Sequence, residues 1–272
     1  MSTQTSLYLP LGFYLISTLF YLSYLAGRRE AFRKIGYYVL WCAFCVHLVA
    51  TVFRYFQAGY TPITNLHESL SFFALSTAAF VLYLTKAYRL AGLGSIVLPI
   101  VSIMLIWAIT IPAPIKPLPP VLQSFWLPIH TVFAFVGNAI FLVGFLVSII
   151  YILAERDIKK KRLHSIFGGF PSLETLDSIN YRCMSYGFPF LTIAIITGSI
   201  WAHTAWGSSW SWDPKETWSL ITWIMYAILI HNRLTRGWRG RKTAYMMILG
   251  FASVVVTFLG VNLFIGGLHS YI

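Results

Sequence analysis

The chain has 272 residues, of which 58% are hydrophobic and 10% are charged, and its formal net charge is +12. Soluble domains carry about 25% charged residues, so this composition excludes a soluble globular fold and indicates a protein whose main solvent is lipid. The positive charge does not indicate nucleic acid binding, because the basic residues are gathered in the connections on one side of the predicted spans.

Eight apolar stretches are long enough to cross a membrane as helices, since about 20 residues at 1.5 Å each span the hydrocarbon core. They cover residues 8–26, 35–55, 66–85, 91–111, 128–153, 187–203, 214–231 and 244–266. We therefore predict an all-α fold, a polytopic integral membrane helical bundle of about eight transmembrane helices that forms a single domain over residues 1–272.

The basic residues predict the orientation of this bundle. With the spans placed as above, every lysine and arginine except Arg54, Lys116 and Lys215 falls on one side. Cytoplasmic loops carry an excess of such residues, so this side is the inner one and both termini lie on the outer side. The same basic runs are suited to contact anionic lipid.

Three connections carry local signals. On the inner side, residues 172–185 place Leu173, Leu176 and Ile179 at helical spacing, which suggests a short amphipathic helix in the interface. On the outer side, the proline-rich connection 111–127 is expected to be extended and leads into the fifth span just before His130. Before the third span, Asn65 can cap the helix while Glu68 reaches back toward its start.

The outer segment 202–216 contains most of a tryptophan-rich sequence that runs on to residue 218. This sequence holds four tryptophans, at positions 206, 210, 212 and 218. Tryptophan commonly anchors proteins at the membrane interface, so composition alone also allows an aromatic belt. The sequence DPKE predicts a firmly defined helix start, with Asp213 at the N-cap, Pro214 at N1 and Glu216 at N3. A fixed start favours a binding platform over a belt.

Histidines accompany this platform. His130 begins the fifth span and His269 follows the eighth, both on the outer side, whereas His231 lies 17 residues beyond Pro214, about 25 Å deeper. Each of them alone could be an interfacial side chain with its tip in water. Two imidazoles over a floor of indole rings, however, suit a planar iron macrocycle, with the iron bound by two axial nitrogens.

At this point the sequence resembles a known family. WGSSWSWDPKETW is similar to the WWD signature of haem-handling proteins, specifically the CcsA (ResC-like) component of the System II cytochrome c synthase, and TPITNLHESLSFF and GLHSY add to the resemblance. The resemblance implies that His130 and His269 ligate haem iron and that His231 contacts haem within the membrane. It assigns haem contacts to Trp206, Trp210, Trp212 and Asp213, and we expect Trp218 to join this surface. His67 stands where the family usually has tyrosine.

The implied function is export of haem b across the membrane and its presentation at the outer site for covalent attachment to an apocytochrome c with a CxxCH motif. The family works with a CcsB (ResB-like) subunit, so synthase activity is expected to require that partner. Arg54 and Lys215 are candidates to pair with the haem propionates, although either could be an ordinary interface charge. No catalytic acid or base can be named.

Three questions stay open at this stage. His47 lies about 18 Å above the inner end of its span, too high to pair with His231 near an inner end, so we expect a histidine of another subunit to be the second ligand of His231. A haem chaperone of CcmC type without synthase activity is the alternative function, and a transporter for another solute is a third. The membrane is either the bacterial plasma (inner) membrane or the thylakoid membrane.

Overall fold

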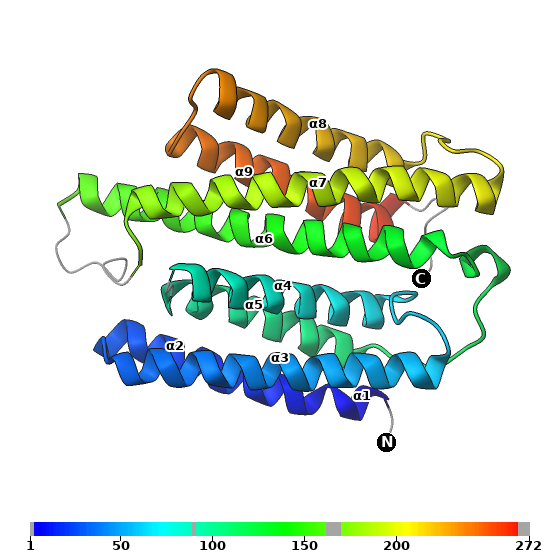
Figure 1. Ribbon diagram of the computed structural model, residues 1–272, viewed down its shortest axis with the longest axis horizontal. Coiled ribbons are helices and arrows are strands. Elements are labelled where there is room, and N and C mark those ends of the chain that lie inside the picture. Colours follow the sequence, from blue (N-terminus) through cyan, green and yellow to red (C-terminus); the bar gives the residue numbers. More distant parts are fainter. Residues whose placement is uncertain (1–2, 89–90, 162–169, 266–272) are drawn as a thin grey trace. The chain divides into compact units, whose positions relative to one another are not determined.

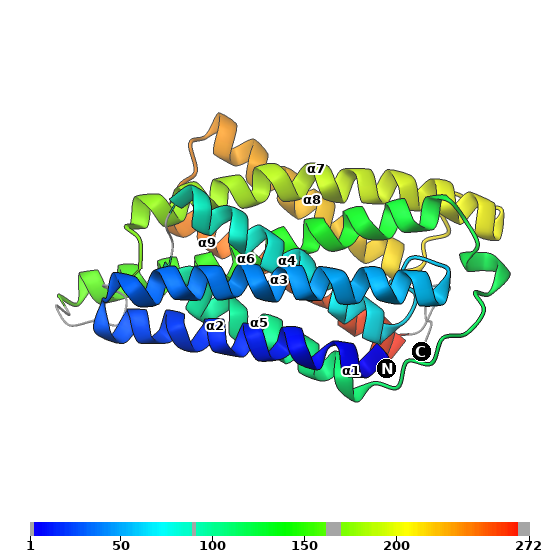
Figure 2. The same ribbon diagram turned by 60° about the horizontal axis from the view of Figure 1, so that its bottom comes forward.

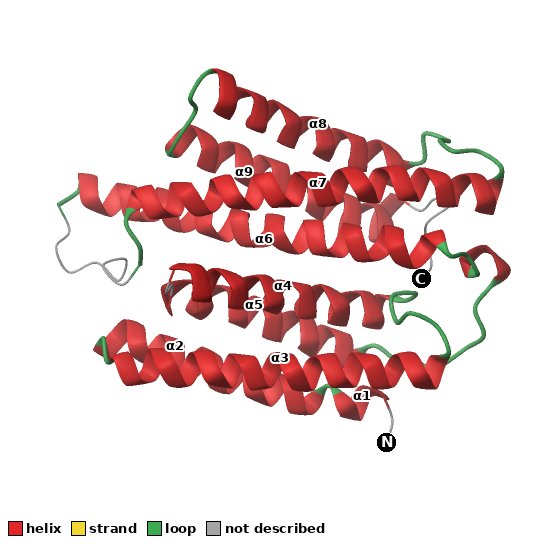
Figure 3. Cartoon of the chain, in the orientation of Figure 1, coloured by secondary structure: helices red, strands yellow, loops and turns green. Residues whose placement is uncertain are grey.

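The computed structural model describes residues 3–88, 91–161 and 170–265, and the regular structure within these ranges is helical throughout (Figures 1 and 3). The elements in chain order are α1 (Thr3–Ser6), α2 (Tyr8–Gly27), α3 (Glu30–Ala58), α4 (Leu66–Tyr88), α5 (Ala91–Thr110), the 3₁₀ turn η1 (Pro120–Leu122), α6 (Trp126–Lys159), α7 (Leu173–Trp206), α8 (Pro214–Thr235), α9 (Arg241–Val255) and a π-helical continuation of α9 (Val256–Ile265). The predicted all-α fold is confirmed.

Each of the eight predicted spans coincides with one of the long helices. Within the described ranges, seven helices are long and apolar enough to cross a membrane, and α8 is the one of the eight that falls short in hydropathy. Polar residues at its two ends, such as Lys215 and Asn232, lower its average. Because α8 has 22 residues and packs along both α7 and α9, we treat it as the eighth span.

Helix α7 differs from its sequence-based description. Residues 173–185 do not form a separate helix, because they are the first turns of the continuous 34-residue α7. The predicted apolar face exists, since Leu176, Ile179 and Cys183 are buried. The helix also continues through Pro189, which transmembrane helices tolerate where neighbouring groups satisfy the freed backbone.

The chain divides into two compact units. Unit 1 comprises residues 1–116 and 153–172, and unit 2 comprises residues 117–152 and 173–272. The prediction of a single domain over residues 1–272 stays a prediction.

In unit 1, four helices contact one another in a closed order, α2 with α3, α3 with α4, α4 with α5 and α5 with α2 (Figure 2). Tyr21 of α2 is fully buried at the centre of this arrangement. Glycines make room for its ring, because a Cβ atom at Gly94 of α5 would lie 2.6 Å from the ring carbon Cδ2. Gly36 of α3 lies on the other side of the same ring. Close helix packing through small residues is typical of membrane proteins.

In unit 2, α6 packs against the other three helices through aromatic side chains. The Phe141 ring of α6 stacks on Tyr226 of α8 at 3.6 Å between centroids, and Phe145 stacks on Phe251 of α9 at 4.8 Å. The contact between α6 and α7 is made at Gly187, which has no side chain and so leaves room for the Phe141 ring. These contacts fix the start of α6 beside the end of α7, where the tryptophan-rich segment begins.

Candidate haem-binding site

The tryptophan-rich segment forms a short, tightly bonded connection between two long helices. Helix α7 ends at Trp206, and Gly207 adopts a φ of +74°, donating its backbone N–H to the carbonyl oxygen of His203. Residues 207–213 then form the loop between α7 and α8 in Figure 1. The predicted helix start is confirmed, because Asp213 and Glu216 form a complete capping box around Pro214.

Glu216 organises most of this loop. Its Oε2 atom accepts hydrogen bonds from the backbone N–H of Ser211 at 2.8 Å, from the Ser211 hydroxyl at 3.2 Å and from the backbone N–H of Asp213 at 3.3 Å. The Thr217 hydroxyl donates to the carbonyl oxygen of Trp212 at 3.3 Å. The backbone on both sides of Trp212 is therefore held by the first turn of α8.

Trp212 has an exposed side chain and a strained backbone conformation. Its φ is +60°, a region that residues other than glycine rarely adopt and that costs about 1–3 kcal/mol. Its side chain is 69% exposed. The Trp210 ring meets it edge to face, with 5.8 Å between centroids. An exposed indole on a hydrogen-bonded, strained backbone is characteristic of a preorganised binding surface.

His130 has its ring orientation and tautomer fixed by the protein. Its Nδ1 atom lies 2.7 Å from the carbonyl oxygen of Ala194 on α7. A carbonyl oxygen can only accept, so Nδ1 is the ring nitrogen that donates a proton in this bond. Gly198, one turn further along α7, allows this approach, because a Cβ atom there would lie 2.6 Å from Nδ1. Metal-ligating histidines commonly donate their second ring N–H in this way.

A tryptophan outside the predicted set links His130 to the platform. The Trp201 ring stacks on His130 with 6.1 Å between centroids and 19° between planes, and it meets Trp206 at 4.9 Å. Trp201 is 1% exposed and its Nε1 donates to the carbonyl oxygen of Val121 at 3.2 Å. It packs with Leu122 and Leu127, so the proline-rich connection is anchored here. Sequence reasoning missed Trp201 because its contacts come from distant parts of the chain.

The other predicted site residues lie at different places. Lys215 and the half-buried Trp218 are in the first turns of α8, beside the loop. His231 is exposed near the opposite end of α8. His269 lies outside the described residues. Arg54 belongs to unit 1, whereas the other described site residues belong to unit 2. Among these, the structure joins His130 to Trp206 through Trp201, and it joins Trp210 to Trp212.

Comparison with known proteins gives one consistent result. Residues 63–269 match the family described as cytochrome C assembly protein. The chain is 36% identical to the cytochrome c biogenesis protein CcsA of Guillardia theta over 98% of this chain and 90% of the relative. It is 38% identical to the CcsA of Synechococcus elongatus, over 80% of this chain and 81% of that protein. The chain belongs to the cytochrome c assembly family and to its CcsA proteins.

A solved structure shows the same fold at lower similarity. The cytochrome c haem lyase CcmF superposes with a TM-score of 0.71 and 18% sequence identity, over 94% of this chain and 46% of CcmF. This CcsA-family chain therefore spans about half the length of CcmF, and the likeness concerns the fold alone.

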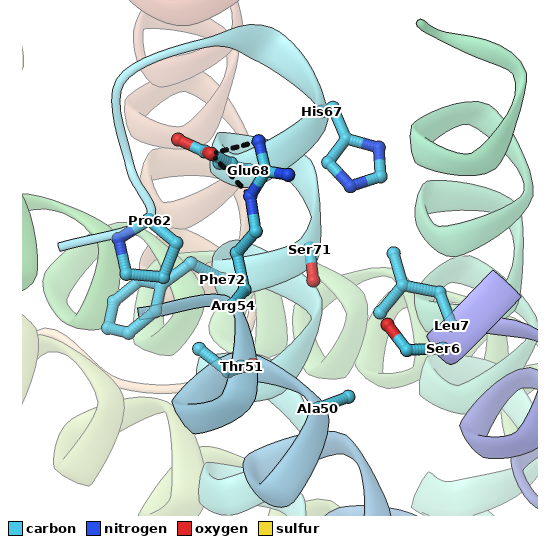
Figure 4. Close-up of a pocket in the computed structure, with 10 residues that line it drawn as sticks. All are labelled: Ser6, Leu7, Ala50, Thr51, Arg54, Pro62, His67, Glu68, Ser71 and Phe72. Carbon is cyan, nitrogen blue, oxygen red and sulfur yellow. Dashed lines mark hydrogen bonds and ion pairs between the residues drawn. The ribbon is translucent and has the colours of Figure 1, made fainter. Parts of the chain in front are cut away.

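This CcsA-family protein also contains a polar cleft in unit 1 (Figure 4). Arg54 of α3 forms a buried ion pair with Glu68 of α4, with Nη2 and Oε1 2.8 Å apart, and also donates to the carbonyl oxygen of Ala113. The predicted cap is confirmed, because the Asn65 side chain accepts from the backbone N–H of Glu68 at 3.0 Å. Glu68 reaches back one residue further than expected, to the N–H of Thr64. Arg54 thus ties three segments of unit 1 together.

Proposed function

We propose that this protein exports haem b across the membrane and presents it at the tryptophan-rich site of unit 2 for covalent attachment to an apocytochrome c. The observation that carries this proposal is the hydrogen bond from His130 Nδ1–H to the carbonyl oxygen of Ala194. It orients an imidazole that stacks on Trp201, and metal-ligating histidines commonly donate their other ring N–H to a carbonyl oxygen in this way.

The residues around His130 suit a planar apolar substrate with charged edges. Trp206, Trp210 and Trp212 offer indole faces and edges on which a porphyrin can pack. Lys215 lies at the positive N-terminal end of the α8 dipole, where a propionate would be stabilised. We assign the second axial position to His269, which the family resemblance implies. We do not assign a propionate to Arg54, because Glu68 neutralises its charge within unit 1.

The reaction proposed for this site is the addition of cysteine thiols to the vinyl groups of haem. Each thiol of the CxxCH motif adds across a haem vinyl group, so one C–S bond forms, the S–H bond breaks, and the hydrogen passes to the other vinyl carbon. The protein's residues hold the ring, exclude water through the tryptophans and leave the vinyl edge accessible. By the distribution of basic residues, this site lies on the periplasmic or lumenal side.

His231 is placed to receive haem within the membrane, but a second ligand from another subunit is needed to hold the haem there. It lies on the exposed face of α8 that also carries Ile221, Ile224 and Ile228, so it points away from the interior of unit 2. His47 is buried in unit 1, and both of its ring nitrogens have hydrogen-bond partners in Tyr14 and Ser71. We therefore propose that a CcsB-like subunit supplies the second ligand to His231.

The test is purification of the chain with and without a CcsB-like partner, followed by the haem absorption spectrum and an assay of covalent cytochrome c. His130→Ala and His269→Ala should each disturb the outer haem and abolish covalent attachment. His203→Ala, which changes an exposed histidine at the end of α7, should leave both unchanged. Unaltered spectra and activity in both site variants would reject the assignment, and bound haem without attachment in the complete complex would favour the chaperone function.

A further inference from the structure

Helix α2 has the reverse of the usual arrangement of polar and apolar side chains. Its buried face carries polar groups at helical spacing, and its exposed face is apolar. The buried polar residues are Tyr14, Ser17, Thr18 and Tyr21, and the exposed residues include Leu9, Leu15, Ile16, Leu19 and Leu22. Polar side chains in membrane spans face the bundle interior, where they either join helices or line a path for ions and polar molecules.

The polar face begins at the cleft of unit 1. His67 donates from Nδ1 to the carbonyl oxygen of Ala108 at 2.7 Å, so its Nε2 is a proton acceptor. His67, Ser71 and the Arg54–Glu68 pair line the cleft together (Figure 4). The cavity volume is about 20 Å³, which is room for one water molecule.

A line of hydrogen bonds leads from this cleft toward the middle of unit 1. The Ser71 hydroxyl is 3.0 Å from His47 Nε2, and His47 Nδ1 is 3.3 Å from the Tyr14 hydroxyl. These three fully or almost fully buried side chains come from α4, α3 and α2. An imidazole between two hydroxyls can accept a proton at one nitrogen and release one from the other, which is the chemistry of a proton shuttle.

Beyond Tyr14 the polar face continues to the opposite end of the bundle. Tyr21 lies seven residues further along α2, about 10 Å, with Ser17 and Thr18 between. Among the described residues, the hydroxyls of Tyr21, Thr85 and Ser102 of unit 1 are buried, and those of Tyr21 and Thr85 lie close to each other without a well-formed hydrogen bond. Such groups are costly in an apolar interior and are commonly satisfied by buried water. Thr85 is followed directly by Lys86, at the predicted inner end.

We propose that unit 1 contains a proton path that runs from the cleft at His67 through Ser71, His47 and Tyr14 to Tyr21 and Thr85. A proton that enters from the cleft passes to Ser71, which gives its own proton to His47 Nε2. His47 then releases the Nδ1 proton to the Tyr14 oxygen, and Tyr14 passes its own hydroxyl proton to the next hydroxyl oxygen along the polar face of α2, where Ser17, Thr18 and Tyr21 follow. One proton moves, every group regains its composition, and no oxidant or reductant is required. This activity goes beyond haem handling and does not depend on it.

The competing explanation is that these groups only join helices, since interhelical hydrogen bonds stabilise membrane proteins. The two explanations differ in one measurable quantity, proton flux. A purely structural cluster would hold its protons, and its removal would change stability alone.

The experiment uses the full chain reconstituted in vesicles that contain a pH-sensitive dye, with a potassium diffusion potential set by valinomycin. Proton uptake by vesicles with the wild-type chain should exceed the leak of protein-free vesicles. Tyr14→Phe removes only a hydroxyl and keeps the ring, and His47→Leu removes the shuttle; both should reduce the flux to that leak. Thr77→Val is the matched control, because the buried Thr77 hydroxyl bonds to Phe73 of its own helix, and its flux should equal the wild type.

Thermal unfolding of each variant in detergent separates loss of the path from loss of the fold. Wild-type flux no greater than the leak, or a folded Tyr14→Phe variant with wild-type flux, would overturn the proposal. Because no haem is added, failure here leaves the proposed haem-handling function unaffected.

Discussion

The imidazole of His130 and the backbone carbonyl of Ala194 are 2.7 Å apart, and they join the first turns of α6 to the later part of α7. This single hydrogen bond sets both the direction of the ring and the nitrogen that carries the proton. A ligand held this way is already oriented before it meets iron. The stacked Trp201 restricts the ring further.

Gly198→Ala should weaken haem binding without altering any side chain at the site. The added Cβ atom would lie 2.6 Å from His130 Nδ1, so the ring must move and its bond to the Ala194 carbonyl oxygen must lengthen. Small misplacements of an active group can cost about 100-fold, and we expect haem affinity to fall at least tenfold with an altered absorption spectrum. Titration of haem into the purified chain measures both.

The matched control for this substitution is Gly12→Ala. Gly12 is also helical, and a Cβ atom there meets nothing within 4 Å. Alanine is the better helix former, so this variant should bind haem as the wild type does. Equal affinity for Gly198→Ala and the wild type would show that the His130 position is not critical.

Glu216→Ala should loosen the 207–213 loop and lower haem affinity. The carboxylate holds the backbone at Ser211 and Asp213, on both sides of the strained Trp212. A hydrogen bond to a charged group contributes about 1.5–3 kcal/mol, so we expect at least a tenfold loss of affinity. Amide hydrogen exchange of residues 207–213 should rise in the same variant.

Two further variants make this prediction specific. Glu216→Gln keeps an acceptor oxygen and should lose less affinity than Glu216→Ala. Glu174→Ala removes an acidic residue from the first turn of α7 and should change neither affinity nor loop exchange. Unchanged exchange of the loop in Glu216→Ala would contradict the role assigned to this carboxylate.

The sequence alone predicted those features that depend only on neighbouring residues in the chain. The apolar stretches of the sequence coincide with all eight long helices, and DPKE predicted the capping box at Asp213, because both signals are written in consecutive residues. The continuity of α7 was missed, since the polar composition of residues 173–185 resembles an interface helix. Packing of Phe141 at Gly187 and the partly buried ion pair of Asp177 with Arg233 hold these residues in one continuous helix.

Contacts between distant segments could not be predicted from the sequence. Trp201 meets His130 and Val121 only because α6, α7 and the proline-rich connection converge. Arg54 read as an available outer cation, yet it is 5% exposed and paired with a glutamate 14 residues later. The sequence around Arg54 is compatible with both a free cation and a buried partner of Glu68, and only the fold distinguishes the two.

Arg54→Met should destabilise the protein rather than act on haem. Removal of one partner leaves the buried Glu68 charge uncompensated, which typically costs about 3–5 kcal/mol. We expect a lower unfolding temperature in detergent, with the haem bound per folded molecule unchanged. The double variant Arg54→Met with Glu68→Gln removes both charges and should recover part of the stability. A selective loss of haem at unchanged stability would instead support a propionate contact.

Asp177→Asn should loosen the connection between α8 and α9. Asp177 of α7 pairs with Arg233 through two hydrogen bonds of 2.8 and 2.7 Å and also accepts from the backbone N–H of Gly240 at 2.6 Å. Asparagine cannot accept both guanidinium bonds, and Arg233 would be left partly buried and uncompensated. The pair retains some solvent contact, so we expect a loss of about 3 kcal/mol or less.

Thermal unfolding in detergent measures this loss, and Arg236→Gln is the control because it removes an exposed cation at the end of α8. The end of α8 also carries His231, two residues before Arg233. Asp177→Asn should therefore weaken haem binding at His231 in the complex with the partner subunit while the spectrum of the His130 site stays unchanged. If the variant unfolds at the wild-type temperature, the ion pair does not anchor this end of α8.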